Sequence, residues 1–320
     1  MLALNAVAAL SFAACGPDSR GSDGDSDADA DGDADGDADG DTDATFPDAN
    51  PNAMKCNKMD LVFVVDDSNS MTEEQTNLAN NFPMFASLLS EFVTADGDPI
   101  DYRIAVTTTG KTFTTHLTGF GFPFSLEEEG DNGAFRDTCG VARRWLEPTD
   151  SNLSTALSCR ANVGVDGPGA EMPLLMTKTA LADRVTDGTN TGFLRPDALL
   201  AVVVLTDEDD SSTSANEQTI GGTSFLPPPP DFHPADLVGF LDGLKGSRTK
   251  WAAGVLAGET ACESAFGKAA EAKRLKQFVQ MANSQGTTQA VFSSICSGDL
   301  TAGLQSALTT FQAACNQIVF

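Results

Sequence analysis

Residues 61–70 read LVFVVDDSNS and contain the strand and the loop on which the fold depends. The first five residues are an unbroken, largely β-branched apolar run, which is typical of a strand covered on both faces. A second run of this kind, LLAVVVL at residues 199–205, is followed by TDEDD. Two buried strands that both end in carboxylates indicate a parallel sheet with acidic groups at one edge.

Helical patterns alternate with short apolar runs along the rest of the folded region. Residues 72–75 (TEEQ) form a capping-box pattern, and apolar residues follow it at helical spacing up to Phe92. Further strands are predicted at 103–106, 251–256 and 289–295, and helices at 171–185, 235–244, 265–281 and beyond Leu300. This alternation predicts an α/β fold, in which a doubly wound, mostly parallel, Rossmann-like sheet is flanked by helices on both faces.

One segment does not follow this rhythm. Residues 110–165 are rich in Gly and Phe, and we expect long loops there around a short strand near Trp145. The acidic run at residues 127–129 is expected to be part of a solvated loop.

Oxygen-bearing side chains gather where the two buried strands end. Asp66 directly follows the first strand, Ser68 and Ser70 come two and four residues later, and Asp207 follows the strand at 199–205. In doubly wound sheets, ligands bind beyond the carboxyl ends of the strands, where the strand order reverses. Oxygen-only ligand sets suit Mg²⁺, Mn²⁺ or Ca²⁺. A mere helix cap at Asp66 would leave the second acidic strand end unexplained, so the pattern favours a metal site.

The spacing Asp66-x-Ser68-x-Ser70 matches the D-x-S-x-S signature of the metal-ion-dependent adhesion site of von Willebrand factor type A domains. Asp207, in the context V-V-L-T-D, resembles the acidic ligand that this family contributes from a later strand end. The resemblance runs from about Cys56 to Cys315. It implies a type A domain over residues 56–320 that binds a divalent cation, Mg²⁺ foremost with Mn²⁺ or Ca²⁺ as alternatives. It also implies a protein partner that offers a carboxylate to the ion.

The third metal loop of that family normally offers a Thr after a glycine turn. Here the turn at residues 164–170 is followed by Glu171, which is the candidate for this position. Asp166, or no protein ligand, is the alternative. Three carboxylates around the ion, from Asp66, Asp207 and Glu171, would weaken its attraction for a fourth. A structural or regulatory ion is therefore an open alternative to an adhesive one.

Six cysteines lie within the region of the resemblance, and no C-x-x-C pair occurs among them. An even number in an exported chain indicates disulfides, and with only two histidines a zinc site is not expected. The sequence alone permits many pairings. The resemblance implies the pairs Cys56–Cys315, Cys139–Cys159 and Cys262–Cys296.

The acidic charge is concentrated ahead of this region. The 320 residues carry a formal charge of −27, and residues 16–50 hold thirteen Asp against one Arg, a net charge of −12. Such a balance excludes a nucleic-acid partner, which needs clustered Lys and Arg. Residues 16–55 are expected to be a disordered, self-repelling Asp-rich linker. Their D-x-D-x-D-G stretches resemble calcium loops, but no Glu closes them, which leaves weak calcium screening as the minor alternative.

The first fifteen residues have the pattern of an export signal. Residues 1–14 are mostly apolar but too short to span a membrane, and they lead into Cys15. Small residues before a cysteine resemble the lipobox of bacterial lipoproteins, although Phe12 is unusual there and no basic segment precedes it. We expect a lipid anchor at Cys15 as the only membrane attachment, with an ordinary signal peptide as the alternative. The expected location is the cell envelope, at the outer membrane or cell surface.

Enzymatic readings fit the sequence less well, and no catalytic residues are predicted. Paired acids after the first strand also occur in phosphotransfer receivers, but those are cytosolic and do not suit a disulfide-rich exported chain. A haloacid-dehalogenase-type phosphatase would need Asp where Ser68 stands, and no G-x-S-x-G elbow is present. His116 and His233 lie in polar or Pro-flanked segments. A metal-dependent hydrolase on the same site and a structural envelope protein are kept as alternatives to protein binding.

Overall fold

The computed structural model of the chain describes residues 55–94, 96–118, 123–221, 228–264, 267–284, 286–298, 300–318 and 320. The expected signal segment at 1–15, its Cys15 and nearly all of the linker at 16–55 lie outside the described residues. None of the described helices is long and apolar enough to cross a membrane.

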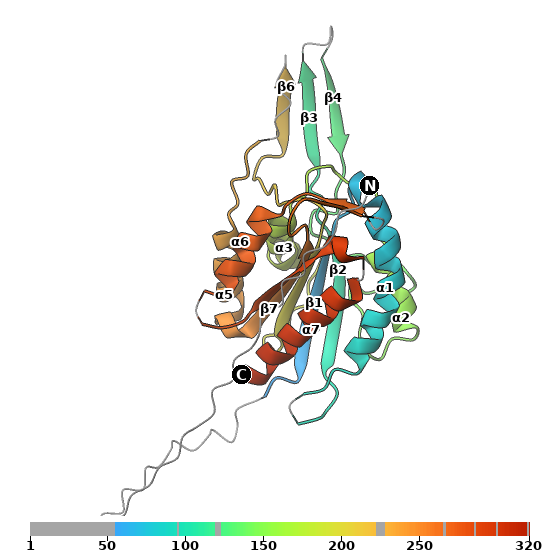
Figure 1. The fold of residues 1–320 in the computed structure, drawn as a ribbon, viewed down its shortest axis with the longest axis vertical. Coiled ribbons are helices and arrows are strands. Elements are labelled where there is room, and N and C mark those ends of the chain that lie inside the picture. The colour runs from blue at the N-terminus through green and yellow to red at the C-terminus, as the bar shows by residue number, and fades with distance from the viewer. Residues whose placement is uncertain are drawn as a thin grey trace, which may run out of the picture. The chain divides into compact units, whose positions relative to one another are not determined.

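A parallel five-stranded sheet forms the centre of the described region (Figure 1). Its strands, in the order β10-β7-β5-β1-β2, are β10 (Ala290–Ser294), β7 (Trp251–Ala257), β5 (Leu199–Leu205), β1 (Lys58–Val65) and β2 (Asp101–Thr108). All four neighbouring pairs are parallel. The predicted doubly wound α/β sheet is confirmed.

Helices cover both faces of this sheet and divide the core into two parts. The helices are α1 (Thr72–Ser90), α2 (Leu153–Ala161), α3 (Pro173–Leu181), α4 (Asp183–Thr186), α5 (Pro234–Lys245), α6 (Lys273–Ala282) and α7 (Leu300–Gln317). Leu61, Phe63 and Val65 pack with α1, α2 and α7, whereas Val62 and Val64 pack with α3, α5 and α6. Successive side chains of a strand point to opposite faces, which explains why β1 is an unbroken apolar run.

A second sheet replaces part of the loops expected at residues 110–165. Strands β3 (Phe113–Thr118) and β4 (Phe124–Glu128) pair antiparallel, and β6 (Glu217–Gly221) pairs with β3 in parallel. The expectation of a loop at residues 127–129 was therefore wrong for the first two residues, which belong to β4. It failed because β6, the partner of β3, comes from a distant part of the chain, and short half-exposed strands give a weak local signal.

The rest of residues 110–165 also differs from the expectation. Helix α2 lies within the segment, and the strand expected near Trp145 is a single antiparallel bridge between Ile104 and Leu146. The buried Arg160 of α2 donates hydrogen bonds to the carbonyl oxygens of Thr138, Val141 and Arg143. These contacts, rather than a helical pattern in the sequence, hold α2 against the loop before it.

One predicted capping motif and one predicted helix start are wrong, although α1 begins at Thr72 as expected. The capping box at residues 72–75 does not form, because the 3₁₀ turn η1 (Asn69–Met71) leads directly into α1, and Thr72 Oγ1 donates to Asn69 O at 2.8 Å instead. The helix predicted at 265–281 begins only at Lys273. Its expected first part includes β9 (Gly267–Ala269), which pairs with β8 (Cys262–Ser264).

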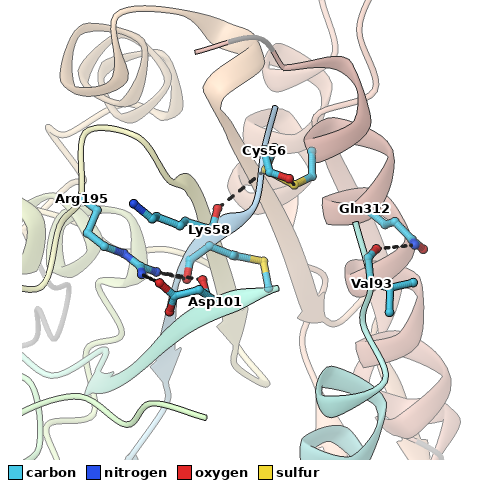
Figure 2. The surroundings of a disulfide bond; sticks show 8 residues. Cys56, Lys58, Val93, Asp101, Arg195 and Gln312 are labelled. Carbon is cyan, nitrogen blue, oxygen red and sulfur yellow. Dashed lines mark hydrogen bonds and ion pairs between the residues drawn. A yellow bond between two sulfur atoms is a disulfide. The ribbon is translucent and has the colours of Figure 1, made fainter. Parts of the chain in front are cut away.

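All three disulfide pairs implied by the family resemblance are present. Cys56–Cys315 joins the chain just ahead of β1 to α7, and Figure 2 shows the ion pair between Arg195 and Asp101 nearby. Cys139–Cys159 attaches α2 to the preceding loop, and Cys262–Cys296 attaches the β8–β9 hairpin to the chain after β10. The disulfides therefore fasten the two ends of the sheet region and the two irregular segments.

We predict that the long-range disulfide contributes more stability than the short-range one. Its cysteines are 259 residues apart and those of Cys139–Cys159 are 20 apart, and loop closure restricts the unfolded chain more when the loop is longer. Replacing both cysteines of a pair by Ser is expected to lower the free energy of unfolding by about 5 kcal/mol for Cys56–Cys315 and about 3 kcal/mol for Cys139–Cys159. Urea denaturation of the two double variants measures both, and a larger loss for the shorter loop would contradict the prediction.

Candidate metal site

The site lies where the strand order of the central sheet reverses. From β1 the chain passes to β2 on one side and later returns to β5 on the other, and Val65 of β1 is in register with Leu205 of β5. The pairing extends one residue further, because Asp66 N donates to Leu205 O at 2.9 Å. Asp66 and Asp207 therefore leave neighbouring strands at the same edge, where doubly wound sheets bind ligands.

Hydrogen bonds connect the four residues that the sequence pattern singled out. Asp66 Oδ1 accepts from Ser68 N at 2.8 Å, the hydroxyls of Ser68 and Ser70 are 2.9 Å apart, and Ser70 Oγ donates to Asp207 Oδ1 at 3.1 Å. Asp66, Ser68 and Asp207 are buried, while Ser70 is exposed. Two carboxylates and two hydroxyls thus form one continuous set of oxygen atoms at the strand ends.

Two further residues hold Asp66 in place. Thr206 Oγ1 donates to Asp66 Oδ2 at 2.6 Å, and Gln75 Nε2 donates to the Asp66 carbonyl oxygen at 2.7 Å. Sequence reasoning missed both roles. Thr206 belongs to the V-V-L-T-D stretch and Gln75 to the predicted capping box. Neither pattern indicates a hydrogen bond to Asp66.

Glu171 lies just ahead of α3 and is buried, and the negative charge of Asp66 contributes to raising its pKa. Its carbonyl oxygen accepts from Ser211 N at 2.8 Å and from Ser211 Oγ at 2.7 Å, which fixes the backbone at this point. Asp166, the alternative to Glu171, is exposed. Among the described residues, no group of three or more His, Cys, Asp or Glu side chains is arranged to hold a metal ion.

The carboxyl groups at this edge carry uncompensated negative charge. Burial, together with the neighbouring charge of Asp66, raises the pKa of Asp207 to about 7 and the pKa of Glu171 to about 9. Burial also raises the pKa of Asp66. In the described part of the chain, no Lys, Arg or His forms an ion pair with these three groups. Buried carboxylates without a counter-ion favour the binding of either protons or a cation.

A fourth carboxyl group, that of Asp67, is enclosed by two glycines. A Cβ on Gly167 would lie 2.2 Å from Asp67 Cγ, and one on Gly110 would lie 3.1 Å from Asp67 Oδ1. Gly167 N also donates to the Asp67 carbonyl oxygen at 2.8 Å. Asp67 is thus a packing element that joins the glycine turn and the chain after β2 to the Asp66 loop.

The acids after β5 have separate roles, although in the sequence they form one run. Asp209 accepts hydrogen bonds from the first amides of α6, including Arg274 N at 2.9 Å. Asp210 accepts from Leu174 N at 3.0 Å and pairs with the Arg274 side chain at 3.1 Å. Both therefore stabilise helix N-termini, and Asp207 is the acid of this run that hydrogen-bonds to the serine loop.

Comparisons with known proteins were made for the whole chain. No protein-family model matches it, and no curated protein matches it. Similar solved structures include proximal thread matrix protein 1 from the mussel byssus with a zinc-occupied MIDAS motif, at 13% identity and a TM-score of 0.41, covering 81% of this chain and 50% of that one. Manganese-loaded TRAP protein of Plasmodium vivax has 12% identity and a TM-score of 0.40, covering 84% of this chain and 77% of that one.

This chain spans about half the length of the mussel protein. Because these identities and TM-scores are low, the fold is assigned from the strand order and register of the chain itself. Those define a doubly wound α/β domain with oxygen-bearing side chains at the point where the strand order reverses.

We predict that the free energy of unfolding decreases as the pH rises from about 5 to about 9 in the presence of EDTA. The pKa of Glu171 is about 9 in the folded protein against 4.5 in a free chain, so the folded state binds protons that the unfolded state releases. The contribution of Glu171 to stability is fully present below pH 4.5 and is lost as the pH rises through its folded-state pKa of about 9.

Urea denaturation over this pH range provides the measurement, with Glu171→Gln as the comparison. This substitution keeps the size of the side chain and removes its titration, so the decrease between about pH 7 and pH 9 should become smaller. An equal decrease in both proteins would contradict the assignment to Glu171.

Proposed function

We propose that the chain binds a divalent cation, with Mg²⁺ foremost and Mn²⁺ or Ca²⁺ as alternatives, through Asp66, Ser68, Ser70 and Asp207. The observation that carries the proposal is the hydrogen-bonded connection from Asp66, through the Ser68 backbone N–H and the two serine hydroxyls, to Asp207. Hard cations of this class prefer carboxylate and hydroxyl oxygens. A bound cation would also supply the positive charge that these buried carboxylates lack.

Glu171 is proposed as a fifth contributor, either directly or through a water molecule. Its pKa of about 9 means that it carries a proton at neutral pH in the absence of a cation. If Glu171 keeps its proton beside a bound ion, it adds no charge there. If Glu171 is ionised, it adds a negative charge that weakens the attraction of the ion for one more carboxylate.

The proposed role of the ion is to bind a protein partner that offers a carboxylate. Ser70 is exposed, while Asp66 and Asp207 are buried. The open side of the ion would therefore face solvent. A divalent ion with an open position accepts an anionic ligand from outside. The protein is therefore proposed to act in adhesion or protein binding.

An extracellular setting agrees with three disulfides in the described residues. We propose a cell-envelope lipoprotein with a lipid anchor at Cys15, an acidic linker over residues 16–55 and a type A domain over residues 56–320. The linker would separate the domain from the membrane surface. No nucleic-acid partner is proposed, because of the charge of −27.

We propose no catalytic residues for this site. His116 lies on β3, where its ring contacts Ser125 Oγ at 2.8 Å and Glu217 Oε2 at 3.3 Å. His233 precedes α5, and its backbone N–H donates to Asp236. In the described chain, neither imidazole hydrogen-bonds to Asp66, Ser68, Ser70 or Asp207, so neither is a base for a nucleophile at the proposed ion.

Metal titration of the full chain tests the cation site. Isothermal calorimetry with Mg²⁺, Mn²⁺ and Ca²⁺ should give one strong site in wild type and at least tenfold weaker binding in Asp66→Asn, which keeps the shape of the side chain but loses its charge. Glu91→Gln, which removes an exposed charge at the end of α1, is the matched control and should bind as wild type does. Coinciding titrations for wild type and Asp66→Asn would overturn the proposal.

Capture from a cell-envelope extract of the source organism tests the partner. Immobilised wild type with Mg²⁺ should retain at least one protein that is lost in EDTA and is not retained by Asp66→Asn. If Asp66→Asn retained every protein that wild type does, the ion would have no part in protein binding.

A further inference from the structure

The three-stranded sheet β4-β3-β6 rises from the rim of the candidate metal site (Figure 1). β3 follows the end of β2, and β6 follows the loop after β5. In the central sheet, β2 and β5 are the two neighbours of β1. The extra strands therefore leave the main sheet on either side of the Asp66 loop and meet beyond it.

The base of this small sheet is firmly attached. Lys111 Nζ donates to the carbonyl oxygens of Thr213, Ser214 and Ala215 at 3.1, 3.1 and 2.7 Å, which joins the start of β3 to the chain before β6. The Asn132 side chain accepts from Thr112 N and donates to Thr112 Oγ1. The small sheet is thus a fixed extension rather than a loosely connected hairpin.

One face of this extension carries most of its apolar side chains. In the register of the sheet, Phe124 of β4 lies opposite Leu117 of β3, which lies opposite Ile220 of β6. Leu126 belongs to the same face as Phe124, two residues further along β4. Phe124 is 48% exposed and Leu126 is 51% exposed, and both are among the most exposed large apolar side chains of the described residues.

Strand β4 is also an edge. It pairs with β3 on one side, and on its other side no strand of the described region pairs with it. An exposed apolar edge strand presents free backbone groups that can pair with a further strand. β4 is therefore a candidate for the addition of an extended segment from outside.

The charge around this edge selects among the possible occupants. Glu127 and Glu128 lie on β4 and Glu129 follows it, while none of the three strands contains Lys or Arg. A second copy of the chain would bring the same acids to this edge and increase its negative charge, which is unfavourable. A segment that carries Lys or Arg between apolar residues would instead pair with them.

We propose that the edge of β4 binds an extended, basic segment of another protein, in which apolar residues alternate with Lys or Arg. The apolar residues of the segment pack on Phe124 and Leu126, its basic residues face Glu127 on the opposite face of the strand, and its backbone adds a fourth strand to the sheet. This surface requires no cation, so it is a second binding site beside the proposed metal site.

The test uses a fluorescent nine-residue peptide of alternating lysine and valine, titrated with the full chain in EDTA and followed by anisotropy. Binding is expected for wild type and should weaken as the salt concentration rises. Leu126→Arg should bind the peptide at least tenfold more weakly, because it places a positive charge beside the lysines of the peptide and removes an apolar contact. The matched control is Met84→Arg on α1, where the side chain is 53% exposed, and its affinity should stay within twofold of wild type.

Two further peptides test the chemistry of the occupant. Exchanging lysine for glutamate should abolish binding, and so should a central proline, which cannot continue a strand. Equal binding of any of these peptides, or equal affinity of Leu126→Arg and Met84→Arg, would overturn the proposal. Analytical sedimentation tests whether a second copy of the chain occupies the edge, and a monomer is expected. A wild-type dimer that Leu126→Arg dissociates would assign the edge to self-association instead. Unchanged urea midpoints show that the variants are folded.

Discussion

The parallel pairing of β1 with β5 is the constraint on which the rest of the structure depends. Both strands are buried apart from Lys58 at the start of β1, and their register brings Asp66 and Asp207 to the same edge of the sheet. A strand end inside a packed domain must have partners for its polar groups. Thr206 and Gln75 provide them for Asp66. The geometry of the candidate site therefore follows from the way in which the sheet ends.

The acids of this edge have opposite effects on folding and on binding. Buried carboxyl groups that repel one another reduce the stability of the protein without a cation, and the raised pKa values of Asp207 and Glu171 report this cost. The same repulsion increases affinity for a divalent ion. The disulfides restrict the unfolded chain and provide none of the oxygen atoms of the site, so they can offset this cost.

The parts of the fold that could be predicted are those whose signal is local. The apolar runs of β1 and β5, the last helix and the four oxygen-bearing residues of the strand ends are all readable over a few positions. The extension β4-β3-β6 was missed because its strands are short, half exposed and paired across the chain. The roles of Asp209 and Asp210 were also hidden, since helices α6 and α3, which they stabilise, are distant in sequence.

The position of β1 between its two neighbours has a mechanical consequence. Cys56 lies just before this strand and Asp66 directly after it, and ladders to β2 and β5 run along both of its sides. A load applied between the chain ahead of Cys56 and a ligand held at Asp66 acts along the strand axis. Such a load shears all of the ladder hydrogen bonds together instead of breaking them one after another. Strand β1 can therefore transmit such a load to both of its neighbours at once.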